Sequence, residues 1–275
     1  DYSGSMCGTM GQVMDQLLHL VTFCKAVNIP FDVYGFTSSN SKLGKNHWGD
    51  DQEDYTGPLT REGEIAHCGL SLPQIVSSKL KKGQYEEAMF HIWLRKELSA
   101  GDYSYDERMI LSKFEEYGST PLNEALINSH RLIKEFKNKN AVDKMNLVVI
   151  SDGDANRVNV CRSRGVDYVE VDMYGKTIIN VDGKKIMMPD RGRQGTKALL
   201  ESIQKKFGIT TIFVTHDQQE ALAVSDRIAI LNEGNIVQID APNELYRNPK
   251  TSYVASFIGS PSINLFDCEV KGGQL

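Results

Sequence analysis

The chain has few of the residues from which disulfide frameworks and transition-metal sites are built. Its 275 residues include five cysteines and six histidines, and no two cysteines have the Cys-x-x-Cys spacing that is typical of zinc and redox motifs. His67 and Cys68 are adjacent, but two neighbouring residues rarely chelate a metal alone. We therefore expect neither disulfides nor a zinc site, and we expect a reducing, cytoplasmic location.

A basic excess and long apolar segments are also missing. The net charge is −5 and the isoelectric point is about 5.7, whereas a surface that binds nucleic acid is usually basic. No apolar segment approaches the roughly 20 residues that a membrane-spanning helix needs. We therefore expect no nucleic-acid partner and no direct membrane insertion. The length allows one large or two modest globular domains.

Helix and strand patterns alternate along the chain. The apolar run from Met145 to Ser151 is typical of a strand that is buried on both faces, and Asp182-Gly183 is a turn signal that predicts a hairpin. The alternation predicts an α/β fold with a doubly wound, mostly parallel sheet. The predicted helices cover 10–28, 72–117, 121–136 and 196–207, and the predicted strands cover 31–37, 145–151, 166–171, 177–181, 185–188 and 209–215.

Residues 38–117 are expected to form mostly a loop and helical insertion. This region contains an acidic cluster, whose members are Asp50, Asp51, Glu53 and Asp54. Such a cluster can bind calcium, but its spacing lacks the regularity of a calcium loop. We favour a solvated surface loop.

Three segments supply oxygen ligands at the ends of predicted elements. The first is the Asp-x-Ser-x-Ser run that opens the chain, the second is a threonine just before a helix, and the third is an aspartate after an apolar strand. Such ligands suit a hard divalent cation, Mg²⁺ or Mn²⁺, although the same residue types also form turns and cap helices. Ligands of doubly wound sheets collect at the carboxyl ends of strands, where all three segments are expected. The candidate metal ligands are Asp1, Ser3, Ser5, Thr120 and Asp152.

This set resembles the metal-ion-dependent adhesion site of von Willebrand factor A (vWA) domains. The family pattern is Asp-x-Ser-x-Ser, then a Thr, then an Asp after a strand, in the order found here. The resemblance implies that both serines and the threonine touch the metal, and that the two aspartates act directly or through water. It also implies that an acidic group of a protein partner fills the open coordination position.

Residues 1 to about 209 are most similar to the cobaltochelatase-subunit-like vWA proteins that are also found in bacteriophages. That resemblance implies a partnership with an AAA+ ATPase. In the vWA fold a strand runs directly into the first aspartate, and here nothing precedes Asp1. We therefore interpret residues 1–209 as a truncated vWA-like domain that lacks its first, central strand.

A second resemblance begins at Gly208, where the sequence runs Gly-Ile-Thr-Thr-Ile-Phe-Val-Thr-His-Asp-Gln-Gln-Glu-Ala. It resembles the ATP-binding subunits of ABC transporters of the sugar, iron or polyamine importer type, and it continues through Ala229–Gly234, Pro242–Pro249 and Phe257–Gly259. The resemblance implies that His216 corresponds to the switch histidine, which contacts the γ-phosphate of ATP, and that a membrane permease is the partner. We interpret residues 210–275 as a small α+β fragment of such a subunit.

The motifs that hold and hydrolyse ATP are missing from these 275 residues. There is no Gly-x-x-x-x-Gly-Lys-Ser/Thr loop to cradle phosphates, and residues 192–197 fail its spacing. There is also no Leu-Ser-Gly-Gly-Gln signature, and no apolar strand ends in Asp-Glu. We therefore expect no catalytic residue in this chain, and we expect His216 to be idle.

Three interpretations of function remain open. The first is a non-catalytic, metal-dependent protein-binding module of the vWA type. The second is a fragment of an ABC importer ATP-binding subunit, which would take ATP as its cofactor. The third is a non-functional chimera, produced by recombination or by faulty joining of sequence reads. A nucleotide-binding assay separates the first two.

Overall fold

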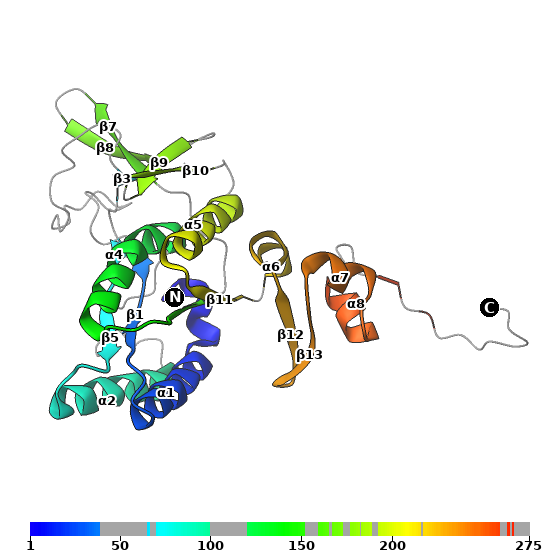
Figure 1. Ribbon diagram of the computed structural model, residues 1–275, viewed down its shortest axis with the longest axis horizontal. Coiled ribbons are helices and arrows are strands. Elements are labelled where there is room, and N and C mark those ends of the chain that lie inside the picture. The colour runs from blue at the N-terminus through cyan, green and yellow to red at the C-terminus, as the bar shows by residue number, and fades with distance from the viewer. Residues whose placement is uncertain are drawn as a thin grey trace, which may run out of the picture. The chain divides into compact units, whose positions relative to one another are not determined.

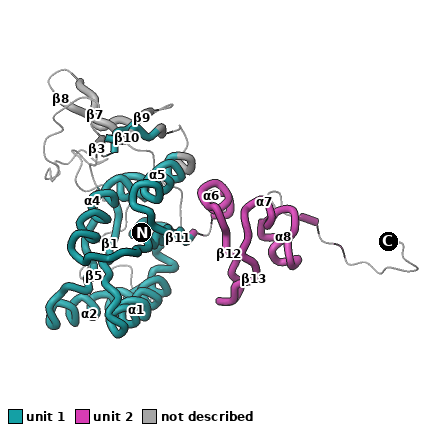
Figure 2. Tube along the Cα trace, viewed as in Figure 1, with its two compact units in different colours: residues 1–214 teal, residues 215–275 magenta. Residues whose placement is uncertain are grey.

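The chain folds as two compact units, Asp1–Val214 and Thr215–Leu275 (Figure 2). The boundary between the units lies after Val214, whereas the sequence predicted the boundary between the vWA-like domain and the ABC-like fragment after residue 209. Most of the predicted insertion, including the acidic cluster, lies outside the described residues. The computed structural model describes residues 1–38, 65–66, 70–99, 120–151, 159–164, 167–172, 177–181, 183–188, 192–215, 217–258, 263–264 and 266.

Helices and short strands alternate in both units (Figure 1). The helices are α1 Met10–Ala26, α2 Lys82–Ser99, α4 Leu122–Asn140, α5 Gly192–Phe207, α6 Gln218–Val224, α7 Pro242–Arg247 and α8 Ser252–Ile258, and a 3-10 helix, η1, covers Gly4–Gly8. The strands are β1 Asp32–Tyr34, β2 Thr37–Ser38, β3 Ile65–Ala66, β4 Leu70–Ser71, β5 Gln74–Ser77, β6 Asn146–Ile150, β7 Asn159–Arg164, β8 Asp167–Asp172, β9 Thr177–Val181, β10 Lys184–Met188, β11 Thr210–Val214, β12 Ile228–Asn232 and β13 Asn235–Asp240.

Several elements form where local sequence chemistry predicts them. Apolar residues at helical spacing bury one side of α1, whose bounds lie within the predicted helix. Helix α5 ends at Gly208, which adopts φ +62°, a left-handed conformation that glycine takes without strain. The predicted hairpin is confirmed by β9 and β10, and Gly183 adopts φ +80° in its turn.

The fold is mixed α/β, as predicted, but an extended doubly wound parallel sheet is not shown. Within the described residues the strands form six small sheets, and the parallel pair is β6 with β11, in register Val148 to Ile212. Strands β1 and β5, β7 and β8, and β9 and β10 pair antiparallel. The β7–β8 and β9–β10 pairs join segments that are close in sequence, as a short connection between antiparallel strands allows, whereas β1 and β5 come from segments about 40 residues apart.

Residues 1–3 connect two of these small sheets. The amino group of Asp1 donates to the carbonyl oxygen of Ile150 at 3.3 Å, and the Tyr2 N–H donates to the carbonyl of Phe36 at 2.8 Å. The start of the chain therefore lies between the end of β6 and the segment between β1 and β2.

Two sequence predictions, one of a helix and one of a fully buried strand, are wrong in detail. Residues 74–77 were expected in a helix but form β5, because they pair with β1 through tertiary hydrogen bonds that outweigh helix propensity. Strand β6 was expected to be buried on both faces. Val149 is buried, but Val148 is 46% exposed, and its neighbours Ile212 and Val214 on β11 are similarly exposed. One face of this parallel pair is therefore not covered by described residues.

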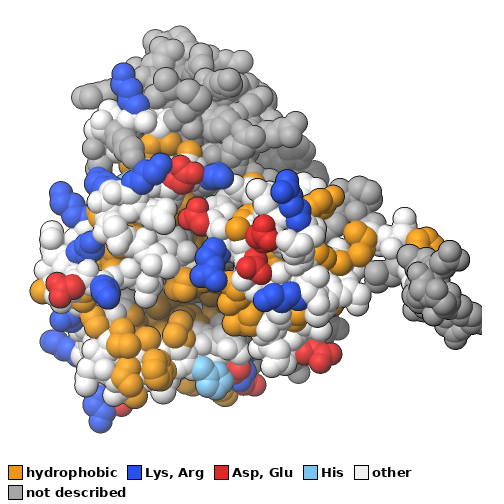
Figure 3. Space-filling model, turned by 45° about the vertical axis from the view of Figure 1, so that its right-hand side comes forward, with side chains coloured by type: hydrophobic (Ala, Val, Ile, Leu, Met, Phe, Trp, Pro, Cys, Tyr) orange, Lys and Arg blue, Asp and Glu red, His pale blue; other side chains and the backbone are white. Residues whose placement is uncertain are grey.

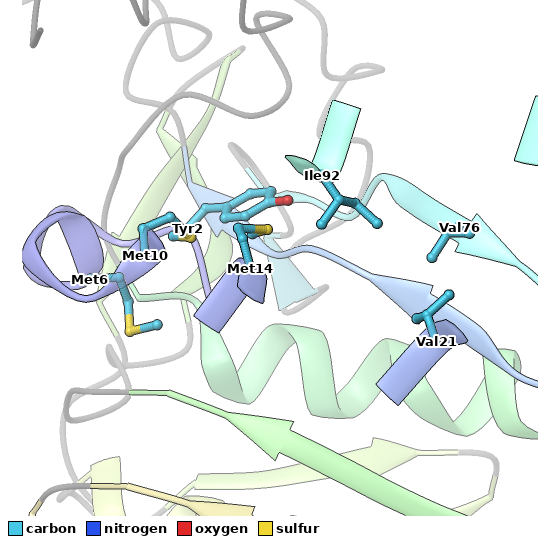
Figure 4. Packing of buried hydrophobic residues seen from close by; sticks show 7 residues of the cluster. All are labelled: Tyr2, Met6, Met10, Met14, Val21, Val76 and Ile92. Atoms are coloured by element: carbon cyan, nitrogen blue, oxygen red, sulfur yellow. The ribbon is translucent and has the colours of Figure 1, made fainter. Parts of the chain in front are cut away.

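The core of unit 1 lies where α1, α2 and β5 meet (Figure 4). Helices α1 and α2 pack against each other, and the Tyr2 ring lies among their side chains. Burying each of these large side chains stabilises the fold by roughly 1.5–3 kcal/mol before conformational entropy is subtracted. The buried cluster consists of Tyr2, Met6, Met10, Met14, Val21, Val76 and Ile92.

Unit 2 is built from neighbouring segments. The hairpin β12–β13 packs against α7, and α7 packs against α8. Its buried apolar cluster has four members, Ile230, Leu245, Val254 and Ile258. The buried Gln238 side chain ties the hairpin to the loop after α7, because its amide donates to the Asn248 carbonyl at 3.2 Å and accepts from the Lys250 N–H at 2.8 Å.

The surface of the described residues mixes charges of both signs. Figure 3 shows Lys and Arg side chains interspersed with Asp and Glu on one face, together with apolar groups. The exposed apolar residues Leu20 and Phe23 on α1 and Val27 directly after it follow one another at helical spacing. Among the described helices, none has the length and apolar character needed to span a bilayer.

Candidate functional site

Three of the predicted metal ligands lie together at the start of the chain. Asp1 and Ser3 lie in the segment that leads into η1, where Ser3 is extended, and Ser5 lies within η1. The hydroxyl oxygens of Ser3 and Ser5 are 3.0 Å apart, and the Ser3 backbone N–H donates to Oδ1 of Asp1 at 2.8 Å. Ser3 is buried and Ser5 is exposed, so the cluster reaches from the protein interior to the solvent. We name these three residues and Ser151 the oxygen cluster.

Ser151 is a member that sequence reasoning missed. Its hydroxyl donates to Oδ2 of Asp1 at 2.7 Å, so each carboxylate oxygen of Asp1 accepts a hydrogen bond. The signal that could have identified Ser151 was its place directly before Asp152 at the end of an apolar strand. The two hydrogen bonds fix the plane of the Asp1 carboxylate.

The donor set fits a small divalent cation. Two neighbouring ligands of an octahedral ion with bonds of about 2.1 Å lie about 3.0 Å apart. The Ser3 and Ser5 hydroxyls are hydrogen-bonded to each other, and this hydrogen bond holds their oxygen atoms at the same separation, 3.0 Å. Groups of three or more His, Cys, Asp or Glu side chains that could hold a metal are absent from the part of the chain that the structure describes. A cation here would therefore depend mainly on hydroxyl oxygens and water.

The remaining predicted site residues are placed only in part. Thr120 is buried just before α4, with Pro121 between them, so the predicted helix start is confirmed. Asp152 and His216 lie outside the described residues. Both follow neighbouring parallel strands, because the Ser151 N–H donates to the Val214 carbonyl at 3.1 Å where β6 and β11 end.

The turn after β11 is held by three side chains. The Thr215 hydroxyl donates to Oε2 of Glu220 at 2.8 Å and accepts from the Asp217 N–H at 3.1 Å. The Asp217 carboxylate caps α6 by accepting from the Glu220 N–H at 3.0 Å. Glu220 is fully buried. The backbone on both sides of position 216 is thereby anchored to the first turn of α6.

A separate hollow of about 460 Å³ lies beside α4 and β5. Within it Gln74 Nε2 donates to the Tyr34 hydroxyl at 3.1 Å, and Arg131 pairs with Glu135 at 2.9 Å. Burial raises the pKa of Tyr34, and the nearby carboxylates of Asp32 and Glu135 add to this effect. Tyr34 is therefore a neutral hydrogen-bonding group at ordinary pH. The hollow is lined by Tyr34, Leu70, Leu72, Gln74, Asn128, Arg131, Leu132 and Glu135.

Comparisons with known proteins give one family of relatives. The chain is 38% identical over 126 residues to the sn-glycerol-3-phosphate import ATP-binding protein UgpC of Roseobacter denitrificans, a match that covers 46% of this chain and 33% of the relative. The spermidine/putrescine import ATP-binding protein PotA of Borreliella afzelii gives the same identity and shares. The diacetylchitobiose uptake system ATP-binding protein MsiK of Streptomyces coelicolor is 36% identical over 124 residues, or 45% of this chain and 31% of the relative.

The extent of these matches changes one expectation. This chain spans about a third of the length of these relatives. A match over 126 residues cannot fit within 210–275, so the similarity also includes residues before 210. The region of similarity is therefore longer than the predicted ABC-like fragment, residues 210–275.

No family model matches the chain, and the comparisons offer no support for a vWA domain. That resemblance therefore stays a prediction, which depends on the oxygen cluster alone. Importer ATP-binding proteins of three bacteria, by contrast, share 36–38% identity with it over a continuous match. About half of this chain is homologous to the ATP-binding subunits of ABC transporters.

Proposed function

We propose that this chain is part of the ATP-binding subunit of an ABC importer, and that its segment after β11 supplies the nucleotide-sensing turn of that subunit. The identity to three importer ATP-binding proteins carries this proposal. ATP would be the nucleotide, and a membrane permease the partner. A cytoplasmic location belongs to the same proposal.

The anchored turn at Thr215–Glu220 gives the proposal a physical basis. A side chain that senses a phosphate must be held at a defined position, because a misplacement of about 1 Å can cost a hundredfold in rate. The Thr215 and Asp217 hydrogen bonds restrict the backbone on both sides of His216. Hydrolysis is proposed only for an assembly that also contains a phosphate-binding loop, since these 275 residues have none.

A segment exchange tests this function. Residues 210–275 would replace the corresponding segment of the Roseobacter denitrificans UgpC protein, and ATP hydrolysis would be measured with purified hybrid protein. The hybrid should hydrolyse ATP, and His216→Ala should reduce the rate by roughly 10²–10³-fold, as expected for loss of one group that stabilises developing charge. Asn235→Ala, at the exposed first residue of β13, serves as the control and should leave the rate unchanged. A folded hybrid without hydrolysis would contradict the proposal.

A second function is favoured by the oxygen cluster. We propose that unit 1 holds Mg²⁺ or Mn²⁺ through Ser3, Ser5 and Thr120, with Asp1 and Asp152 acting through water or directly. The Ser3–Ser5 hydrogen bond, which holds two hydroxyl oxygens 3.0 Å apart next to the Asp1 carboxylate, carries this proposal. An acidic group of a protein partner would complete the coordination, and no bond would be broken. An AAA+ ATPase as that partner remains a prediction from resemblance.

Thermal unfolding in the presence of metal tests the second function. A cation that binds only the folded chain stabilises it by about 2.7 kcal/mol at a concentration 100 times its Kd. The melting temperature should therefore rise with Mg²⁺, and the double variant Ser3→Ala/Ser5→Ala should abolish the rise. Cys7→Ala is the matched control, because Cys7 is exposed on the same turn and contributes no oxygen. If folded protein gives neither a rise in melting temperature with Mg²⁺ nor ATP hydrolysis by the hybrid, the third interpretation, a non-functional chimera, is the one that remains.

A further inference from the structure

We propose that Arg95, acting through the ring of Tyr2, positions the oxygen cluster for cation binding. This inference rests on the second proposed function, the metal site of unit 1. Arg95 belongs to α2 and is 5% exposed, and its guanidinium carbon lies 3.9 Å from the centre of the Tyr2 ring.

Tyr2 stands between two members of the oxygen cluster. In an extended segment successive side chains point to opposite sides, and Ser3 has extended dihedral angles, φ −68° and ψ 158°. Asp1 and Ser3 therefore lie on one side of the chain and Tyr2 on the other. Figure 4 shows the Tyr2 ring directed into the core beside Met10, Met14 and Ile92. The placement of this ring sets the placement of the oxygen atoms on either side of it.

The backbone of Tyr2 is held as firmly as its ring. The Tyr2 N–H donates to the Phe36 carbonyl at 2.8 Å, and the Tyr2 carbonyl accepts from the Thr37 hydroxyl at 3.3 Å. Gly35 lies directly against the ring, since a Cβ atom at this position would be 2.5 Å from Cε2 of Tyr2. Gly35 and Arg95 thus both restrict where the ring can lie. Larger side chains at position 35 would displace it.

The contact of the Arg95 guanidinium with the Tyr2 ring allows a positioning role of Arg95 to be distinguished from a purely electrostatic one. A buried guanidinium stacks favourably on an aromatic face, but its positive charge opposes the binding of a nearby cation. If Arg95 acted on the metal only through its charge, then Arg95→Met would tighten metal binding. If Arg95 positions the loop through Tyr2, the same substitution weakens metal binding. The two explanations therefore predict changes of opposite sign.

The test is a titration of the full chain with Mn²⁺, in which free Mn²⁺ is measured by electron paramagnetic resonance below the melting temperature of every variant. Arg95→Met and Gly35→Ala should each weaken Mn²⁺ binding by about tenfold, the lower end of the range for residues that orient metal ligands. Tyr2→Phe keeps the ring and should bind like the wild type, whereas Tyr2→Leu should bind weakly. Val76→Ala is the control for stability, because Val76 is buried in the same cluster on β5. It should lower the melting temperature and leave the Mn²⁺ affinity unchanged.

The outcomes separate the two proposals. If the wild type binds no Mn²⁺, the metal site and the positioning role both fail. If the wild type binds Mn²⁺ and both Arg95→Met and Gly35→Ala bind equally well or better, only the positioning role is overturned. Equal weakening by Val76→Ala would also overturn it, since the effect would then follow stability alone. Should Arg95→Met fail to fold, Arg95→Lys replaces it, because lysine keeps the charge and loses the planar stack on Tyr2; unchanged Mn²⁺ binding by Arg95→Lys would overturn the positioning role.

Discussion

The two units differ in how far apart along the chain their essential partners lie. In unit 1 the hydroxyl of Ser151 binds the carboxylate of Asp1 across 150 residues, and the parallel strands β6 and β11 come from segments about 60 residues apart. In unit 2 the whole buried cluster comes from residues 230–258. Contacts that are local in sequence require little loop closure, whereas distant ones must wait for it. The buried core of unit 2 is therefore formed by neighbouring segments. The oxygen cluster of unit 1 forms only after distant segments of the chain have come together.

The same contrast separates the two proposed functions. The ABC-like segment keeps its anchored turn within six residues, from Thr215 to Glu220. The oxygen cluster instead needs Asp1 and Ser151, which are 150 residues apart in the sequence. A perturbation of the unit 1 core should thus affect metal binding, whereas the turn after β11 should be sensitive mainly to changes close to it.

The largest expected effect comes from the core of unit 2. Leu245 is fully buried, and Leu245→Ala should destabilise this unit by about 2–5 kcal/mol. A unit of this size has a total stability of only a few kcal/mol. Hydrogen exchange followed by mass spectrometry should show rapid exchange in β12 and β13 and unchanged protection in α1. Tyr246→Ala, at a 70% exposed neighbouring position, is the control. Equal loss of protection in both units would contradict their independence.

The next largest effect concerns the buried amide of unit 2. Gln238→Ala removes the donor to the Asn248 carbonyl and the acceptor for the Lys250 N–H. Leaving buried polar groups without partners costs about 1–3 kcal/mol. Exchange should accelerate in α7 and β13, while Ile236→Ala, on the same strand but exposed, should change little. Both tryptophans, Trp48 and Trp93, lie in the span of unit 1, so tryptophan fluorescence should not report this change.

Two glycines in unit 1 should respond to alanine with opposite signs. Gly208 has φ +62° and open space around it, so Gly208→Ala should cost about 1 kcal/mol through backbone strain alone. Gly83 lies in the first turn of α2, also with open space, and Gly83→Ala should stabilise by roughly 0.5–1 kcal/mol. Urea unfolding followed by tryptophan fluorescence measures both. The comparison would fail if both variants shifted the midpoint in the same direction.

The smallest effect is a pH dependence at the contact between α1 and α2. Lys96 lies 2.6 Å from the carboxylate of Asp15 and lowers its pKa chiefly by a hydrogen bond, and the pKa of Lys96 is raised by the same bond. The stabilisation from Asp15 is therefore present at neutral pH and is lost as the pH falls through its lowered pKa. The contribution from Lys96 is lost only when the pH rises through its own raised pKa.

Asp15→Asn should consequently lower the urea midpoint slightly at pH 7 and leave it unchanged near pH 2. Both side chains are partly exposed, which keeps the effect small. Glu86→Gln is a matched control, because its contact with Lys82 is longer and more exposed. A larger difference at acidic pH than at neutral pH would show that the sign is wrong.

Sequence patterns predicted the parts of the fold that depend on neighbouring residues. The helix of Met10–Ala26, the β9–β10 hairpin and the helix end at Gly208 all formed where spacing and turn residues indicated. The sequence predictions failed where the pairing or covering segment was distant along the chain. Residues 74–77 became a strand because β1 lies beside them, and Val148 stayed exposed because no described segment covers that face of β6.

The candidate site shows the same division. The sequence proposed Asp1, Ser3 and Ser5 from their spacing, and the structure keeps them together. The structure adds Ser151, whose hydroxyl binds Asp1, and it places the buried Arg95 against the buried ring of Tyr2. No sequence motif indicated these three residues. Side chains that support a site carry no pattern of their own, since their role arises only from what they touch.

By itself, the sequence determined where turns, caps and helical faces occur and that residues from Gly208 onward resemble importer ATP-binding subunits, because these properties depend on residue type and short spacing. Only the tertiary structure decided which strands pair, which apolar face stays exposed and which groups surround Asp1. Those outcomes depend on contacts between segments up to 150 residues apart, and such contacts form only when the long loops between them have closed.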